Sequence, residues 1–222
     1  SLYYEDEFVE LHHGDCRAVR GWTLADVLVT DPPYGTENGN GYGRSGGNGR
    51  VGNFYISGDA TTEIRDWALE SWGDRPRMVF GSPRAPEPPG EWSDRLVWDK
   101  REPGLNGGPW RYTHESIFVG GEGWKRQSAS SFSILSSPSG NGTWAKSQHA
   151  HSKPVGLMET LITSAPTGVI ADPFAGSGST LIAARNIGRK VIGVELEEKY
   201  CELIVKRLSQ QAFDFSALEG AA

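Results

Sequence analysis

The chain has 222 residues, of which 37% are hydrophobic and 23% are charged, a composition typical of an ordinary soluble globular protein. Its apolar runs are far shorter than the roughly 20 residues that cross a bilayer, so we expect no membrane partner. The net charge of −6 gives no overall support for a nucleic-acid partner, although a local basic region can still meet a polyanion.

Neither a targeting segment nor a disulfide framework is expected. The acidic N-terminal stretch SLYYEDEFVEL lacks the basic region and apolar core of a signal peptide. The two cysteines, Cys16 and Cys201, lie far apart and form no CxxC pattern, so reduced thiols are the simplest interpretation. We therefore expect a cytoplasmic protein.

Short apolar runs alternate with helical patterns along the chain. The continuous runs that predict buried strands lie at residues 8–11, 27–30, 78–80, 96–98, 117–119, 169–171 and 191–194. Apolar residues at helical spacing predict helices over 61–72, 154–164, 180–186 and 197–211. This alternation indicates an α/β fold, a Rossmann-like doubly wound, mostly parallel sheet. Because no helical pattern separates 96–98 from 117–119, we expect an antiparallel strand at one edge.

Two regions predict loops instead. Residues 36–53 hold seven glycines, and residues 127–141 are rich in Ser, Pro, Gly and Asn. A passive linker explains either of them, but a loop of this length in a compact domain is more often functional or disordered.

The tetrapeptide Asp31-Pro32-Pro33-Tyr34 ends the strand predicted at 27–30. Ligands bind at the carboxyl ends of strands in open α/β sheets, although a strand-ending turn alone also explains these residues. Chemically, the Asp31 carboxylate and the Pro32 carbonyl could accept both N–H bonds of an exocyclic amino group, which would free its lone pair for a methyl donor. Tyr34 offers a flat face on which an unstacked base could lie.

A second site follows the strand predicted at 169–171, where the sequence reads DPFAGSGST. Gly176 and Gly178 allow a sharp turn and close approach to a ligand, and Ser179 or Thr180 could cap the helix that follows. Glu195 lies 17 residues after Gly178, close to the offset at which an acid grips a ribose diol. There is no third glycine, so a nucleoside without a pyrophosphate fits better than a dinucleotide, and S-adenosylmethionine is the obvious candidate.

Together the two motifs resemble the amino-methyltransferases of DNA, in the circularly permuted arrangement called the β class, where DPPY precedes the cofactor loop. LHHGD at 11–15, RLVWDK at 95–100, HESIFVG at 114–120, HSKPVGLMETLI at 151–162 and VIGVELEEKYCELIVKRL at 191–208 extend the resemblance over most of the chain. It implies one catalytic domain over residues 1–222 with the S-adenosylmethionine-dependent methyltransferase fold, and it permits a homodimer. It also implies a cytoplasmic protein of bacterial, archaeal or phage origin that acts on double-stranded DNA.

The resemblance assigns roles to individual residues. Asp31, Pro32, Pro33 and Tyr34 would surround the target base. The residues implied around S-adenosylmethionine are Asp15, Asp31, Lys153, Asp172, Phe174, Gly176, Gly178, Ser179, Thr180 and Glu195. The chain departs from the family in its target-recognition region, since only the short segment 121–150 precedes the HSKP-like stretch. The resemblance therefore predicts the chemistry more firmly than the DNA sequence that is recognised.

DNA contacts are expected from a basic part of the chain. Between residues 100 and 153, seven basic and three acidic residues give a local charge of +4. Tryptophans stand beside cations there, as in nucleic-acid-binding surfaces, although ordinary packing of amphipathic side chains explains them equally well. The candidate DNA contacts are Arg44 and Arg50 in the glycine-rich loop, and Lys100, Arg101, Arg111, Lys125 and Arg126.

Several alternatives remain open. The Asp form of the motif favours N6-adenine over N4-cytosine, without excluding cytosine. A protein-glutamine or RNA methyltransferase would resemble an Asn-Pro-Pro-Tyr enzyme with the cofactor loop first, and Asp31 and the reversed order argue against it. An inactive nucleic-acid-binding module that keeps the fold is a further alternative, which the intact motifs disfavour. Carbon-5 methylation of cytosine needs a cysteine nucleophile in a Pro-Cys setting, and the absence of that setting at Cys16 and Cys201 argues against it. The pair His149 and His151 has no third ligand nearby in sequence, so no metal is expected.

Overall fold

The structure is a computed structural model. It describes residues 1–35, 61–101, 110, 112–126, 132–137 and 152–219. The predicted loop 36–53, the candidate DNA contacts Arg44, Arg50 and Arg111, and the pair His149 and His151 lie outside them. The segment 121–150 is described only in part.

The elements alternate much as the sequence predicts. The strands are β1 (Leu2–Glu5), β2 (Val9–His13), β3 (Val27–Thr30), β4 (Arg77–Gly81), β5 (Asp94–Asp99), β6 (His114–Gly120), β7 (Ile134–Ser136), β8 (Ile170–Asp172) and β9 (Val191–Glu195). The helices are the 3-10 turn η1 (Gly21–Leu24), α1 (Glu63–Trp72), α2 (Val155–Thr163), α3 (Ser179–Asn186) and α4 (Glu198–Glu219). No helix among the described residues is long and apolar enough to span a bilayer.

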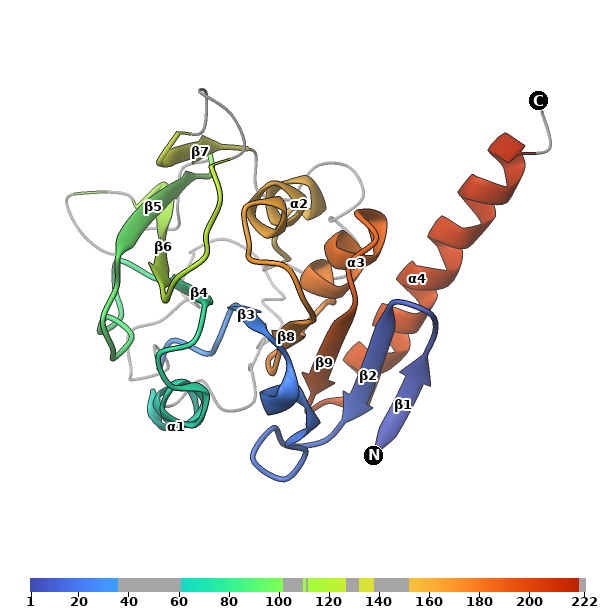
Figure 1. Cartoon of the computed structure of the whole chain (residues 1–222), viewed down its shortest axis with the longest axis horizontal. Helices are drawn as coiled ribbons and strands as arrows, with labels where there is room; N and C mark the ends of the chain where they lie inside the picture. Colours follow the sequence, from blue (N-terminus) through green and yellow to red (C-terminus); the bar gives the residue numbers. More distant parts are fainter. Residues whose placement is uncertain (36–60, 102–109, 111, 127–131, 138–151, 220–222) are drawn as a thin grey trace, which may run out of the picture.

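All nine strands of the described chain form one sheet in the order β1-β2-β9-β8-β3-β4-β6-β5-β7 (Figure 1). From β2 to β4 every neighbouring pair is parallel, whereas β6 runs antiparallel to both β4 and β5. The prediction of a mostly parallel α/β sheet is therefore confirmed.

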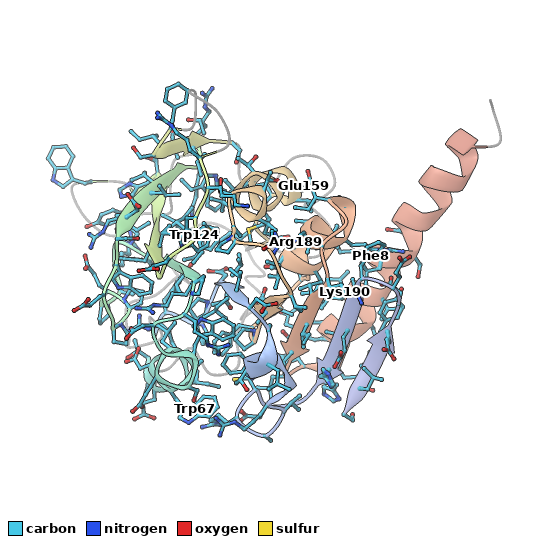
Figure 2. The ribbon with its side chains drawn as sticks, viewed as in Figure 1. Phe8, Trp67, Trp124, Glu159, Arg189 and Lys190 are labelled. Atoms are coloured by element: carbon cyan, nitrogen blue, oxygen red, sulfur yellow. The ribbon has the colours of Figure 1, made fainter. Side chains whose placement is uncertain are left out.

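Two apolar clusters cover the two faces of this sheet, and Figure 2 shows the side chains that fill the space between the sheet and its helices. In β3, Val27 and Val29 join the cluster formed with α2, α3 and α4, whereas Leu28 joins the cluster formed with η1 and α1. This alternation follows from the period of two in a strand, which sends successive side chains to opposite faces. The central strands read as continuous apolar runs because both of their faces are buried.

Two strands differ from the sequence-based expectation. β1 and β7 are not predicted, and β7 lies inside the stretch 127–141 that is expected to be a loop. Both are short strands at the edges of the sheet, and β7 is mostly exposed, so neither carries the buried apolar run that would signal it. The prediction of antiparallel pairing is confirmed, because β5 and β6 are antiparallel and β1 is an antiparallel edge strand beside β2. β7 extends the other edge and is parallel to β5.

The position of the site follows from the connections of β3 and β8. These strands are adjacent and parallel, yet β3 leads through α1 to β4 on one side and β8 leads through α3 to β9 on the other. Helices α1 and α3 also pack on opposite faces. The sheet thus changes its direction of winding between β3 and β8, which is where open α/β sheets form a ligand crevice.

Candidate active site

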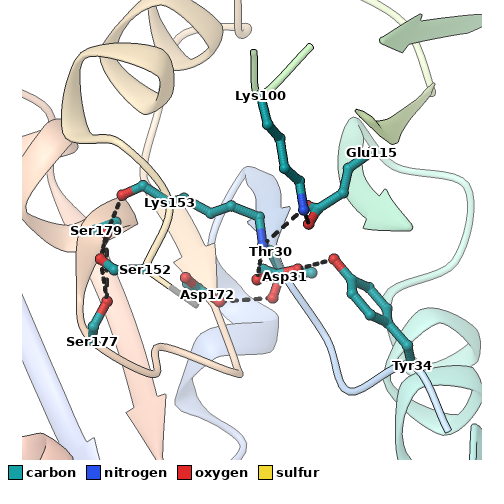
Figure 3. A network of polar contacts seen from close by, with 10 residues as sticks. All are labelled: Thr30, Asp31, Tyr34, Lys100, Glu115, Ser152, Lys153, Asp172, Ser177 and Ser179. Atoms are coloured by element: carbon teal, nitrogen blue, oxygen red, sulfur yellow. Dashed lines mark hydrogen bonds and ion pairs between the residues drawn. The ribbon is translucent and has the colours of Figure 1, made fainter. Parts of the chain in front are cut away.

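Asp31 follows β3 at this switch point, and two side chains hold its carboxylate. Tyr34 donates its hydroxyl to Oδ1, and the Lys153 ammonium pairs with Oδ2 (Figure 3). The Asp31 side chain keeps 30% of its exposure, whereas Lys153 keeps only 8%. The structure therefore brings together DPPY and the lysine of the HSKP segment, 122 residues apart in the chain.

Lys153 also connects Asp31 to a second carboxylate. Its Nζ lies 3.2 Å from Oε2 of Glu115 on β6, and Oε1 of Glu115 lies 2.5 Å from Nζ of Lys100. The Lys153 ammonium also lies over the rings of Phe80 and Trp98, at 5.0 and 5.9 Å from their centroids. Four charged groups thus form a continuous row from Asp31 to Lys100 (Figure 3).

For the two buried members of this row, Lys153 and Glu115, the attraction of the neighbouring opposite charges affects the pKa more than burial does. Burial by itself lowers the pKa of Lys153, but the charges of Asp31 and Glu115 outweigh it and the pKa is raised. Burial likewise opposes ionisation of Glu115, but Lys153 and Lys100 lower its pKa. All of these shifts favour the charged forms.

Asp172 ends β8 beside Asp31 and is fully enclosed. Its Oδ1 accepts the Thr30 hydroxyl at 2.7 Å and the Phe174 amide at 3.2 Å. Burial raises its pKa to about 6, against the hydrogen bonds from Thr180 and Thr30. Its contacts brace the start of the glycine loop against β3.

The glycine loop faces Glu195 at the end of β9. Glu195 accepts the Gly176 amide on Oε2 at 2.7 Å and the Glu197 amide on Oε1 at 2.8 Å. Burial raises the pKa of Glu195 to about 7. Gly176 has φ +52°, and a Cβ there would meet only the Phe174 carbonyl, at 3.9 Å, so the backbone is open on that side. A half-buried Phe174 flanks this open stretch.

Ser179 and Thr180 do not cap α3 as predicted. Gly178 is the N-cap in a left-handed conformation, and no side chain caps the helix. Instead, Ser179 Oγ donates to the Lys153 carbonyl at 2.7 Å, while Thr180 hydrogen-bonds to Asp172. Both side chains are buried, so they fix the loop from within. The bond from Ser179 ties the backbone of Lys153 to the glycine loop, which joins the two predicted sites.

Asp15 lies two residues beyond β2, next to the end of β9. The Gly14 amide donates to the Glu195 carbonyl at 2.8 Å, which sets the two acids on neighbouring strands. Arg17 pairs with the Asp15 carboxylate at 2.5 Å and lowers its pKa. Both predicted acids thus lie at the same edge of the sheet as Asp31.

The candidate DNA contacts separate into two groups. Arg101, Lys125 and Arg126 are exposed, as a phosphate contact requires. Lys100 is instead engaged by Glu115 and keeps only 28% of its side-chain exposure, so its ammonium is not available to a phosphate in this arrangement. Its sequence neighbours gave no sign of this, because Glu115 lies on another strand.

Among the residues around the site, sequence reasoning missed Glu115, Thr30 and Ser152. Ser152 Oγ lies 2.9 Å from Ser177 Oγ and 3.1 Å from Ser179 Oγ, which ties the HSKP segment to the glycine loop. The quoted stretch HESIFVG contains Glu115, but a lone acid in a predicted strand carries no functional signal.

Among the described residues no group of three potential metal ligands occurs. Burial raises the pKa of both cysteine thiols to about 12, which fits the expectation that neither is a nucleophile.

Comparison with known proteins adds family information. A family model described as DNA methylase matches residues 91–206. The chain is 43% identical over 76 residues to the putative methylase YubD of Escherichia coli, covering 33% of each sequence. It is 40% identical over 67 residues to the type II methyltransferase M.HinfI of Haemophilus influenzae, covering 29% of this chain and 19% of that protein. The matches thus span a third or less of these curated relatives.

Solved structures extend the likeness to nearly the whole fold. A complex of M1.HpyAVI with S-adenosylmethionine matches with a TM-score of 0.59 and 22% identity, covering 90% of this chain and 99% of that one. The cytosine-N4-specific PvuII DNA methyltransferase matches with a TM-score of 0.58 and 14% identity, covering 91% and 86%. At these identities the matches establish the fold.

Proposed function

Because this chain belongs to the N6/N4 DNA methylase family, we propose that it transfers a methyl group from S-adenosylmethionine to an exocyclic amino group in DNA. The observation that carries the proposal is the meeting of Asp31 and Lys153 at the switch point of the sheet, directly beside the glycine loop. One edge of the sheet therefore places Asp31, a possible acceptor for an amino group, next to the glycine loop, a possible binding site for a nucleoside.

The residues around the glycine loop fit S-adenosylmethionine, which when bound supplies an electrophilic methyl group on a sulfonium. The backbone at Gly176 leaves open space where a Cβ would stand. Glu195 is held at the end of β9 by two amides, and its free lone pairs suit a ribose diol. Phe174 and Asp15 flank the same edge and would contact the remainder of the nucleoside. Asp172, Ser179 and Thr180 would act by fixing the loop.

Asp31 would accept an N–H of the target amino group. Its two oxygens already hold Lys153 and Tyr34, but a carboxylate has about four acceptor positions and keeps room for another donor. This hydrogen bond strengthens as positive charge develops on nitrogen, so it stabilises the transition state more than the ground state. Bound S-adenosylmethionine would supply its methyl group to the amino nitrogen and would be left as S-adenosylhomocysteine, and one N–H proton of the methylated nitrogen would leave past Asp31 to water.

Pro32, Pro33 and Tyr34 would shape the base pocket. Consecutive prolines have a fixed φ and no amide donor, which leaves the Pro32 carbonyl free to accept the second N–H of the amino group. The hydroxyl of Tyr34 is anchored on Asp31, so its ring is held beside the acceptor where a flipped base would stack.

We favour the N6 amino group of adenine in double-stranded DNA as the target, because the Asp form of the motif favours adenine. The position of this motif before the cofactor loop favours DNA over protein or RNA. N4-cytosine is the second candidate, supported by the structural likeness to the cytosine-N4-specific PvuII enzyme. Exposed Arg101, Lys125 and Arg126 are proposed to contact phosphates.

The proposal is tested with unmethylated double-stranded DNA and methyl-labelled S-adenosylmethionine. Wild-type protein should label DNA, and mass spectrometry of the nucleosides should give N6-methyladenine. Asp31→Ala should lower transfer by at least about 100-fold, since it removes a transition-state acceptor, while cofactor affinity changes far less. Asp74→Ala is the matched control, because this side chain is 98% exposed on another part of the fold. Label in N4-methylcytosine would favour the second candidate, and label in protein or RNA but not in DNA would refute the proposal.

A further inference from the structure

Glu115 is a buried carboxylate to which neither the DPPY motif nor the glycine loop assigns a role. Only 11% of its side chain is exposed, and it lies on β6 directly opposite Trp98 of β5. Its Oε1 is 2.5 Å from Lys100, and its Oε2 is 3.2 Å from Lys153. The contact between Oε2 and Lys153 is an ion pair, and among the described residues Oε2 has no other polar partner. Taking this carboxylate out of water costs free energy, which its pairing with two ammonium groups offsets, so removing its charge would leave those ammonium groups uncompensated.

The charge balance of the row shows what Glu115 contributes. Lys100 and Lys153 carry two positive charges, and Asp31 and Glu115 carry two negative charges, so the row is neutral. Without Glu115 the same groups would carry a net charge of +1. The rings of Phe80 and Trp98 beside the buried Lys153 ammonium limit the access of water to the centre of the row, which weakens the screening of this excess there.

The proposed chemistry makes that excess harmful. Methyl transfer places positive charge on the amino nitrogen beside Asp31. An uncompensated positive charge behind Asp31 would oppose this step, and it would also draw Lys153 more tightly onto the carboxylate that has to receive the amino group.

We propose that Glu115 is a positioning residue for methyl transfer, which holds the Lys153 ammonium between two carboxylates and balances the charge of the row from Asp31 to Lys100. This inference rests on the proposed function. It also assigns Lys100 to the same row, as the cation that balances Glu115, rather than to the DNA backbone.

Two substitutions separate charge from shape. Glu115→Gln keeps the size of the side chain and removes its charge, whereas Glu115→Asp keeps the charge and shortens the side chain by one methylene. A purely structural role predicts that Gln is tolerated better than Asp. We expect the reverse order, with single-turnover methyl transfer lowered by roughly tenfold or more in Glu115→Gln and less in Glu115→Asp. Glu87→Gln, which removes an exposed carboxylate paired with Arg95, is the matched control and should keep the wild-type rate.

A binding measurement tests the same charge without turnover. S-adenosylmethionine is a cation at sulfur, whereas S-adenosylhomocysteine lacks that charge and the methyl group. Glu115→Gln should therefore raise the ratio of the Kd for S-adenosylmethionine to that for S-adenosylhomocysteine by about threefold. Lys100→Met removes the balancing cation and should lower this ratio. Calorimetry measures both, and thermal melts check that each variant is folded.

The transfer rates of the two Glu115 variants and the Kd ratio of the two ligands together test the role proposed for Glu115. The proposal is overturned if Glu115→Gln transfers methyl groups as fast as wild type, if Gln is tolerated better than Asp, or if the Kd ratio is unchanged. Should Glu115→Gln fail to fold, Lys100→Met and Glu115→Asp still supply the ratio and the rate. Failure of the proposed function is seen separately, as wild-type protein that labels no DNA.

Discussion

Gly178, at the end of the cofactor loop, packs closely against helix α4. It has φ +82° at the start of α3, and a Cβ there would lie 2.7 Å from Cγ1 of the buried Ile204 on α4. Gly188, just beyond the end of the same helix, has a similar φ of +69° with no atom within 4 Å of its Cβ position. The two glycines therefore share the backbone requirement and differ in steric room.

The difference in steric room predicts how much each substitution lowers the free energy of unfolding. An alanine in the left-handed region costs about 1–2 kcal/mol, partly offset by about 0.4–1 kcal/mol from a less flexible unfolded chain. Gly188→Ala should therefore lower the free energy of unfolding by about 1 kcal/mol. Gly178→Ala adds overpacking against Ile204, which costs about 1–3 kcal/mol, for a total of about 2–4 kcal/mol.

Urea denaturation of the two variants and the wild type, followed by circular dichroism, measures these differences. In thermal melts of the same variants, the melting temperature should fall further in Gly178→Ala than in Gly188→Ala by about 2–12 °C, given a domain of this size. Equal losses in the two variants would refute the reasoning, because they would show that α4 yields and that only the backbone conformation matters.

Three other predictions follow from the charges and hydrogen bonds of the site. Folding raises the pKa of Glu195 from 4.5 to about 7 and that of Asp172 from 3.8 to about 6. The folded protein therefore binds more protons than the unfolded chain between pH 5 and pH 8. The free energy of unfolding should fall by up to about 4 kcal/mol over this pH range. Denaturation curves that show a rise in the free energy of unfolding would contradict this. Thr30→Val removes a buried 2.7 Å hydrogen bond to Asp172 and should cost about 1–3 kcal/mol by urea titration, and a change below about 0.5 kcal/mol would mean that the bond is unimportant. Replacing exposed Lys125 and Arg126 with Gln should weaken DNA binding and reduce its dependence on salt; an identical salt slope would exclude them as phosphate contacts.

Much of the fold and part of the site could be predicted because they are encoded locally. The apolar run before Asp31 and the strand-turn-helix around Gly176 each specify an element and its end within about ten residues. Once the strands are parallel, their carboxyl ends meet at one edge, so Asp31 and Glu195 had to lie near each other. Short exposed strands such as β7 carry no comparable signal, which is why β7 was expected to be part of a loop.

The sequence by itself determined which elements form and which residues stand at their ends. Only the tertiary structure decided how charges pair across those ends: Lys100 with Glu115, Glu115 with Lys153, and Lys153 with Asp31. These partners come from the ends of β3 and β5, from β6 and from the segment before α2. The physical reason is that the pairing and ionisation of a buried charge depend on its neighbours and on its exclusion from water, and both arise only when distant parts of the chain pack together.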